Sequence, residues 1–178
     1  VLRLRNSDPQ KISLKREVLK QPEVTARIVD KENGVGLIQV RSLQAEHVKQ
    51  IAAKAKDLES QGAKKIILDF RNCAAGDQEN GIEVANLFLD KGLITYLQGQ
   101  KQGRKDFPAE ASKQISKLPL AVITSRGTAG AAEIAASGLA ENKRAEVVGD
   151  RTYGSAGVRR TVTLDDGSAL ILSVAKYY

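Results

Sequence analysis

The sequence predicts an α/β domain built around a largely parallel sheet. Three observations lead to this fold class: short apolar runs alternate with helical segments, glycine-containing turns separate them, and 178 residues can bury a core without a disulfide or a metal. The composition, 42% hydrophobic and 28% charged, is typical of a soluble globular protein.

The first 22 residues are predicted to form a unit apart from the rest. Val1–Arg5 and Ile12–Arg16 alternate apolar and polar residues, the period of a half-buried strand, and Asn6–Pro9 between them is typical of a turn. We therefore expect a hairpin within residues 1–22 and a core domain over residues 23–178.

The core is predicted to open with two strands and a helix. Val24–Val29 and Gly36–Val40 are strand candidates joined by a turn at Lys31–Gly34. The hydrophobic period then changes to i, i+3, i+4 and i+7, which predicts an amphipathic helix over Gln44–Ser60. Gly62 lies where the C-cap of that helix is expected.

Strands and helices continue to alternate in the middle of the chain. Ile66–Phe70 is a short apolar run typical of a buried strand, and Ile82–Leu89 is the next predicted helix. Leu93–Leu97 is a further strand, and the polar segment Gln98–Lys105 is expected to be a mobile loop.

The last third follows the same pattern and ends in a hairpin. Leu118–Thr124 and Ala145–Gly149 are predicted strands, and the alanine-rich segment Ala129–Ala140 between them favours a helix. An Asp-Asp-Gly turn joins two strand candidates, Val158–Leu164 and Ala169–Val174.

Two loops lie at the predicted carboxyl ends of strands, Arg71–Asp77 and Ser125–Thr128. Ligands of open α/β sheets bind at this edge. The strand, glycine turn and helix start around the second loop resemble a nucleophile turn, where backbone N–H groups stabilise an oxyanion. A plain strand-to-helix connection gives the same local pattern, so the turn by itself leaves both interpretations open.

Charge and cysteine content exclude several classes of function. The formal net charge is +7, but the basic residues are scattered and few aromatic residues lie among them, so we expect no nucleic-acid partner. A single cysteine, Cys73, excludes an internal disulfide and a multi-cysteine zinc site, and no metal or cofactor is expected. No apolar stretch is long enough to predict a transmembrane segment.

Two parts of the chain match motifs of one family of peptidases. Leu68–Asn72, followed by Gly76, is similar to the loop Asp-Leu-Arg-Asn-Asn-Pro-Gly-Gly, and Glu83–Asp90 looks like the helix after that loop. Gly127–Ile134 matches Gly-Thr-Ala-Ser-Ala-Ser-Glu-Ile, and Glu141–Ala145 matches Asp-Asn-Lys-Arg-Ala.

The C-terminal part adds three matches in the same order as in that family. Gly149–Gly154 resembles the start of Gly-x-x-Thr-Phe-Gly-Lys-Gly, Asp166–Ser168 matches Asp-Gly-Ser, and Ala175–Tyr178 matches Ala-Lys-Tyr-Tyr. On these motifs the chain, from about Gly34 to its last residue, resembles the carboxyl-terminal processing (tail-specific) proteases, which are Ser–Lys serine peptidases.

The resemblance implies a core related to the ClpP and crotonase spirals, with a PDZ domain inserted ahead of it. Residues 1–22 would then be the tail end of that PDZ-like domain or a linking hairpin, and residues 23–178 a protease-like core truncated at its C-terminal end. It also implies a polypeptide partner bound through its C-terminal end, and a periplasmic or otherwise extracytoplasmic location.

The catalytic positions of the family, transferred one by one, depart from its pattern. The nucleophilic serine matches Gly130, the general-base lysine matches Ser155, the supporting carboxylate matches Glu141, and the second serine of the motif matches Ala132. A Ser–Lys dyad needs an attacking hydroxyl and an amine of lowered pKa that accepts its proton. We therefore expect a domain that binds extended peptides without Ser–Lys catalysis.

The oxyanion hole is expected to be partly preserved. The resemblance implies one N–H from Ala131 and another from Ala75 or Gly76. Cys73–Gly76 replaces the glycine-rich pattern of the family, and Ala75 disfavours a positive φ, so the conformation of this loop is open.

The alternative hypothesis is an active serine-type peptidase with a displaced nucleophile. Thr128 and Ser125 flank the turn and are the candidate hydroxyls, although both are common turn and N-cap residues. A Cys73–His47 pair is a weaker candidate, because His47 is expected at the start of the first helix. Lys176 belongs to the Ala-Lys-Tyr-Tyr motif and is expected to be structural.

Overall fold

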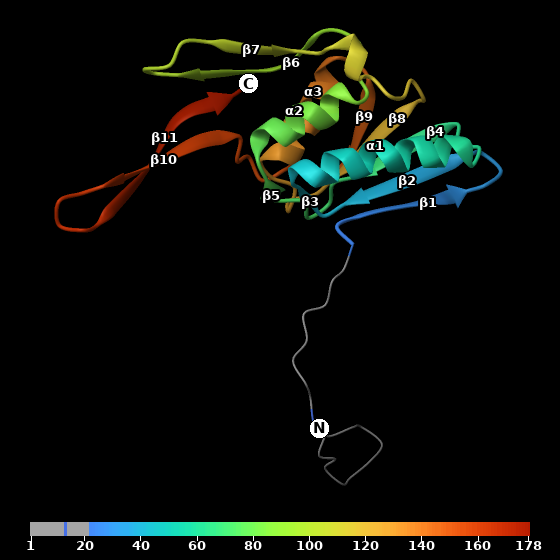
Figure 1. Ribbon diagram of the computed structural model, residues 1–178, viewed down its shortest axis with the longest axis horizontal. Helices are drawn as coiled ribbons and strands as arrows, with labels where there is room; N and C mark the ends of the chain where they lie inside the picture. The colour runs from blue at the N-terminus through green and yellow to red at the C-terminus, as the bar shows by residue number, and fades with distance from the viewer. Residues whose placement is uncertain (1–12, 14–21) are drawn as a thin grey trace.

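The computed structural model describes residue 13 and residues 22–178, which form an α/β body with a projecting β-ribbon (Figure 1). The hairpin predicted for the first residues lies outside this part of the chain. Within it, no helix is long and apolar enough to cross a membrane.

A five-stranded sheet forms the base of the body. Its strands lie in the order β1 (Val24–Asp30), β2 (Val35–Val40), β4 (Lys65–Asp69), β8 (Leu120–Thr124) and β9 (Ala145–Gly149). The last four are parallel to one another, and β1 pairs antiparallel with β2 at one edge. The predicted parallel-rich sheet is confirmed.

Three helices cover the sheet: α1 (Ala45–Ser60), α2 (Gln78–Asn86) and α3 (Ala131–Glu141). A short 3₁₀ helix, η1 (Ala111–Lys113), precedes β8. Helix α1 buries one face toward the core, at positions three or four residues apart as the sequence predicts: His47, Ile51, Ala55 and Leu58.

Helices α2 and α3 approach each other closely at a glycine. A Cβ atom at Gly81 in α2 would lie only 2.1 Å from the carbonyl oxygen of Ala131, the first residue of α3. Because only glycine permits this approach, Gly81 sets the position of the N-terminus of α3.

A second, antiparallel sheet lies beyond α3 and contains β6 (Leu93–Gly99), β7 (Lys105–Pro108), β10 (Gly157–Thr163) and β11 (Ala169–Tyr177). Strand β11 pairs with β6 only over its last residues, Ala175–Tyr177. The rest of β11 pairs with β10 alone, so these two strands form a ribbon that extends from the body (Figure 1).

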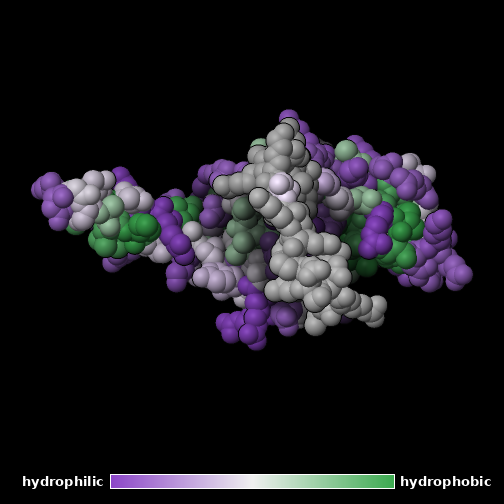
Figure 2. Space-filling model, turned by 90° about the horizontal axis from the view of Figure 1, so that it is seen from below, coloured by the Kyte–Doolittle hydropathy of each residue, from purple (hydrophilic) through white to green (hydrophobic). Residues whose placement is uncertain are grey.

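The ribbon leaves apolar side chains exposed, as the green patch on the projecting arm in Figure 2 shows. The pairing places Val162 opposite Leu170. Strand side chains alternate between the two faces, so Leu172 and Leu164 share the face of this pair. All four are exposed.

One expectation about a loop is corrected, and three short strands were missed. Gln98–Lys105 is not one loop, because β6 continues to Gly99 and β7 begins at Lys105, so the segment is largely the turn of a hairpin. Strand β7 was missed because Lys105 and Asp106 are exposed and carry no apolar signal. The two-residue strands β3 (Ser42–Leu43) and β5 (Ala75–Gly76), which pair in parallel, were also missed.

Candidate functional site

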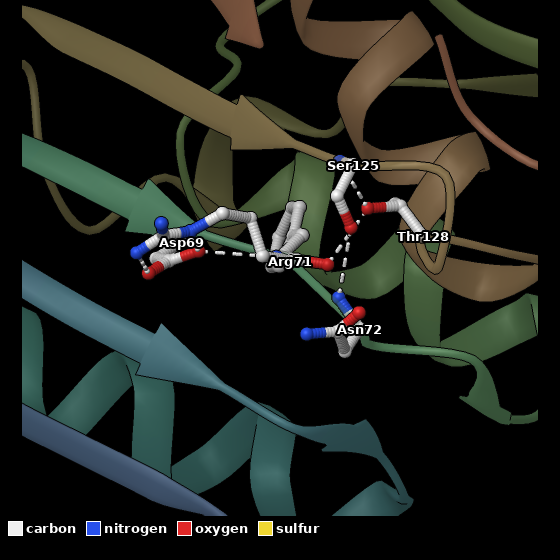
Figure 3. Close-up of polar contacts among 6 residues, drawn as sticks. Asp69, Arg71, Asn72, Ser125 and Thr128 are labelled. Carbon is white, nitrogen blue, oxygen red and sulfur yellow. Dashed lines mark hydrogen bonds and ion pairs between the residues drawn. The ribbon is translucent and has the colours of Figure 1, made fainter. Parts of the chain in front are cut away.

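The two loops singled out in the sequence lie together at the carboxyl ends of β4 and β8 (Figure 3). The backbone N–H of Asn72 donates to Ser125 Oγ at 3.2 Å. The N–H of Ala129 donates to the carbonyl oxygen of Cys73 at 3.0 Å. These bonds join the loop after β4 to the turn after β8.

A buried ion pair fixes the first of these loops. Asp69, at the end of β4, is fully buried and accepts two side-chain hydrogen bonds from Arg71, Nε to Oδ1 at 2.9 Å and one terminal nitrogen to Oδ2 at 2.7 Å. Burial alone raises the pKa of the Asp69 carboxyl, but the hydrogen bonds and charge of Arg71 outweigh it and hold the pKa below its ordinary value.

Thr128 is a structural residue of the turn. Its side chain is fully buried, its hydroxyl donates to the carbonyl oxygen of Phe70 at 2.8 Å, and it accepts the N–H of Ser125 at 2.9 Å. Because this buried hydroxyl both donates and accepts a hydrogen bond inside the protein, it is not available to attack a substrate.

We expect Thr128→Val to lower the free energy of unfolding by about 1–3 kcal/mol, because it removes the hydroxyl that donates to the buried carbonyl oxygen of Phe70 and that accepts the half-buried N–H of Ser125. Urea unfolding followed by circular dichroism measures the change. The control is Thr163→Val, since Thr163 is exposed on the ribbon. Equal stability of the two variants would contradict this role of Thr128.

Ser125 has a similar supporting role. Its Oγ accepts the N–H groups of Asn72 and Gly127, each at 3.2 Å. In the described part of the chain, no lysine or histidine forms a hydrogen bond with Ser125, Thr128 or Ser155. The structure therefore brings no base to the two candidate hydroxyls.

Gly130 occupies a sharp turn between β8 and α3. It is the N-cap of α3, with φ +60° and ψ −115°, a conformation that side chains with a Cβ rarely adopt. A nucleophile turn holds its serine in such a strained strand-to-helix bend. A Cβ at this position would meet only the carbonyl oxygen of Ser155, 3.9 Å away. The positions predicted for nucleophile and base therefore lie side by side, with open space at Gly130.

Glu133 is the carboxylate of the site, and it was not among the residues predicted from the sequence. It is 8% exposed and accepts three backbone N–H groups: Gly130 at 2.8 Å, Gly154 at 2.6 Å and Ser155 at 2.8 Å. Burial by itself raises the pKa of Glu133, but hydrogen bonds from the Thr152 side chain and these three N–H groups lower it below 4.5. A glutamate three residues after the N-cap is the signal that predicts such a cap.

The structure does not bring Glu141 to this site. Glu141 is the exposed last residue of α3, whereas Gly130 precedes the first, so about 16 Å of helix separates them at about 1.5 Å per residue. The prediction that Glu141 supplies the supporting carboxylate is therefore corrected. The carboxylate that joins the turn at Gly130 to the loop at Gly154 and Ser155 is Glu133.

The proposed oxyanion donors lie on the two facing segments. Ala131, next to Gly130, is buried, and Ala132 follows it into the core. In the opposite loop the positive φ angles fall on Asn72 (+61°) and Gly76 (+134°), and Ala75 is not among the residues with a positive φ. The alanine is therefore accommodated without the strain that its sequence position suggested.

Cys73 and His47 do not form a catalytic pair. Burial, with a smaller contribution from the charge of Glu23, raises the pKa of the Cys73 thiol to about 12, so the reactive thiolate is absent near neutral pH. His47 Nδ1 lies 2.9 Å from the carbonyl oxygen of Ser42 and receives the N–H of Gln44, as part of the cap of α1.

A strand-to-helix turn of this kind, on a parallel sheet and facing a second loop, is a framework used by serine-type peptidases with an α/β fold, and this domain has that framework. The chain belongs to peptidase family S41, whose model matches residues 34–178.

Curated relatives align with almost the whole chain. The carboxyl-terminal-processing protease of Synechocystis sp. is 34% identical over 171 residues, which are 95% of this chain and 40% of that protein. The chloroplastic carboxyl-terminal-processing peptidase 1 of Arabidopsis thaliana is 33% identical over 170 residues, 93% of this chain and 35% of that protein. The chain is thus a carboxyl-terminal-processing-protease-like domain that spans less than half the length of these relatives.

Solved structures agree with the fold. The photosystem II D1 C-terminal processing protease superimposes with a TM-score of 0.78 at 26% identity, over 90% of this chain and 44% of that chain. A putative S41 protease from Bacteroides fragilis gives a TM-score of 0.71 over 92% of this chain and 47% of that one. Its 18% identity shows a shared fold alone.

Proposed function

We propose that this domain binds extended polypeptide chains at the Gly130 turn and does not hydrolyse them by a Ser–Lys route. The observation that carries the proposal is the turn itself: Gly130 has the backbone conformation of a nucleophile turn with no side chain, and Ser155 rather than a lysine lies beside it. A glycine cannot attack, and a serine cannot act as a base near neutral pH.

The proposal extends to partner and location. The carboxyl-terminal-processing protease relatives support a polypeptide ligand, with its C-terminal end as the segment recognised, and a site of action outside the cytoplasm. Residues 1–22 would be the end of a preceding PDZ-like domain or a linking hairpin.

The rival function, a peptidase with a displaced nucleophile, has less support. Thr128 uses its hydroxyl both to donate and to accept inside the core, and Ser125 Oγ accepts two backbone N–H groups. Neither arrangement supplies the base that an attacking hydroxyl needs.

The test incubates the protein with unstructured peptides that end in small apolar residues. Fluorescence anisotropy measures binding, and mass spectrometry detects hydrolysis. We expect binding without product peptides. Ser155→Tyr, which puts a large ring into the cavity next to the Gly130 turn, should weaken binding by about tenfold or more, whereas Ala53→Tyr on the exposed face of α1 should not.

Two outcomes would overturn the proposal. Absence of binding would remove the peptide-binding function. Product formation that exceeds that of a Ser125→Ala, Thr128→Ala double variant would instead establish the displaced-nucleophile peptidase.

A further inference from the structure

A cavity of about 290 Å³ lies next to the Gly130 turn and is lined by the loop Gly154–Gly157, by three polar side chains of the ribbon and by Tyr177. Ser155 lies on one side of it, and Arg159, Ser173 and Lys176 lie on the ribbon side. Ser155 connects this cavity to the turn where the peptide is proposed to bind, because its carbonyl oxygen lies 3.9 Å from a Cβ built at Gly130.

A β-bulge gathers the ribbon residues on one side of the cavity. Ser173 and Lys176 are three positions apart, and a regular strand would place them on opposite faces. The pairing of β10 with β11 shifts between Val158 and Arg159, which leaves one extra residue, Val174, in β11. The extra residue turns Lys176 to the face of Ser173 and of its partner Arg159.

The walls of the cavity are fixed by backbone hydrogen bonds. The N–H of Tyr177 donates to the carbonyl oxygen of Ala156 at 2.9 Å, and the N–H of Ser155 donates to Glu133 at 2.8 Å. These hydrogen bonds therefore fix the loop at Ser155 and Ala156 relative to the ribbon in the absence of a ligand.

The two cations of the cavity have no acidic partner. Ion pairs elsewhere in the described part of the chain join Arg71 to Asp69 and Lys113 to Glu83. No carboxylate among the described residues lies within ion-pair distance of Arg159 or Lys176. Two like charges that line one cavity together with serine hydroxyls favour an anion there.

We propose that this cavity is a carboxylate subsite of the peptide-binding site. Arg159 and Lys176 pair with a carboxylate of the bound chain, and the hydroxyls of Ser155 and Ser173 complete its hydrogen bonds. The proposal rests on the proposed function, because it places the carboxylate on a peptide that passes Gly130. The carboxylate is either the free C-terminus or an Asp or Glu side chain, and both offer the same planar group to arginine.

The experiment compares three forms of one peptide: the free acid, the C-terminal amide, and the amide with aspartate as its last residue. Isothermal titration calorimetry gives each Kd for the wild type, Arg159→Gln and Lys176→Gln. The matched control is Arg160→Gln, since Arg160 is the neighbour of Arg159 and points to the other face of the ribbon.

We expect the wild type to bind a carboxylate-bearing peptide about tenfold more tightly than the plain amide. Arg159→Gln and Lys176→Gln should each reduce this preference to about threefold or less, and Arg160→Gln should leave the preference intact. Tighter binding of the free acid alone assigns the subsite to a C-terminus, and tighter binding of the aspartyl amide assigns it to an acidic side chain.

Binding of the amide with no preference for either carboxylate would overturn the subsite and leave the peptide-binding function standing. A preference that Arg160→Gln removes as strongly as Arg159→Gln would also overturn it, because the effect would then come from net charge. Failure of all three peptides to bind would overturn the proposed function itself, and the subsite with it.

Discussion

Replacing Glu133 by Gln is expected to lower the free energy of unfolding by about 2–4 kcal/mol. The buried carboxylate accepts the N–H groups of Gly130, Gly154 and Ser155, and an amide can accept at only one of its two terminal atoms. The new NH₂ group would face an N–H donor, so buried donors lose their acceptor and the loop at Gly154 is released. Urea unfolding and hydrogen exchange of the Gly154 and Ser155 amides measure the two effects.

The matched control is Glu146→Gln, because Glu146 is an exposed carboxylate on β9. It should change the free energy of unfolding by less than about 0.5 kcal/mol. If Glu133→Gln were equally mild, the carboxylate would not hold the turn.

The effect of Glu133 should also depend on pH in a defined direction. Its pKa in the folded protein lies below 4.5, its ordinary value, so ionisation of Glu133 stabilises the fold at pH values above 4.5. This contribution is lost as the pH falls through the lowered pKa. The stability difference between wild type and Glu133→Gln should therefore be largest near neutral pH and shrink in acid.

Gly81→Ala is expected to cost about 3 kcal/mol, although alanine is the better helix former by about 1 kcal/mol. The added Cβ would lie 2.1 Å from the carbonyl oxygen of Ala131 and 2.8 Å from its carbonyl carbon. Both atoms belong to the backbone, so no side-chain rotation can relieve the clash, and α2 must move away from the N-terminus of α3. Thermal and urea unfolding measure the cost.

Gly103→Ala is the control for this variant, because a Cβ at Gly103 meets nothing within 4 Å and the residue has no positive φ. It should be neutral to within about 0.5 kcal/mol. A neutral Gly81→Ala would show that the two helices separate freely.

The parts of the fold that were predicted are those with a strong apolar period. Strands β4 and β8 appear as continuous apolar runs because one face is buried and the other carries half-buried apolar residues, and α1 appears through its stripe of buried residues. Strand β7 has no such signal, since Lys105 and Asp106 are exposed.

The residues of the candidate site that lie in recognisable motifs were predicted from the sequence. The residues whose roles depend on three-dimensional geometry were missed. The turn at Gly130 and its neighbour Ser155 were both found through motif positions, and the structure brings them together. Glu141 was assigned to the site through a motif match alone, although the helix predicted over Ala129–Ala140 already placed it at the end opposite Gly130. The role of Lys176 in lining the cavity depends on a bulge, which no sequence period reveals.

The carboxylate of Glu133 has a consequence for the thermodynamics of any ligand that binds beside Gly130. Because three backbone N–H groups are already held, the loop at Gly154 and Ser155 loses its conformational freedom when the chain folds, not when the ligand arrives. Association then involves a smaller loss of entropy than it would at a mobile loop. A weak set of contacts can therefore give measurable affinity at this turn.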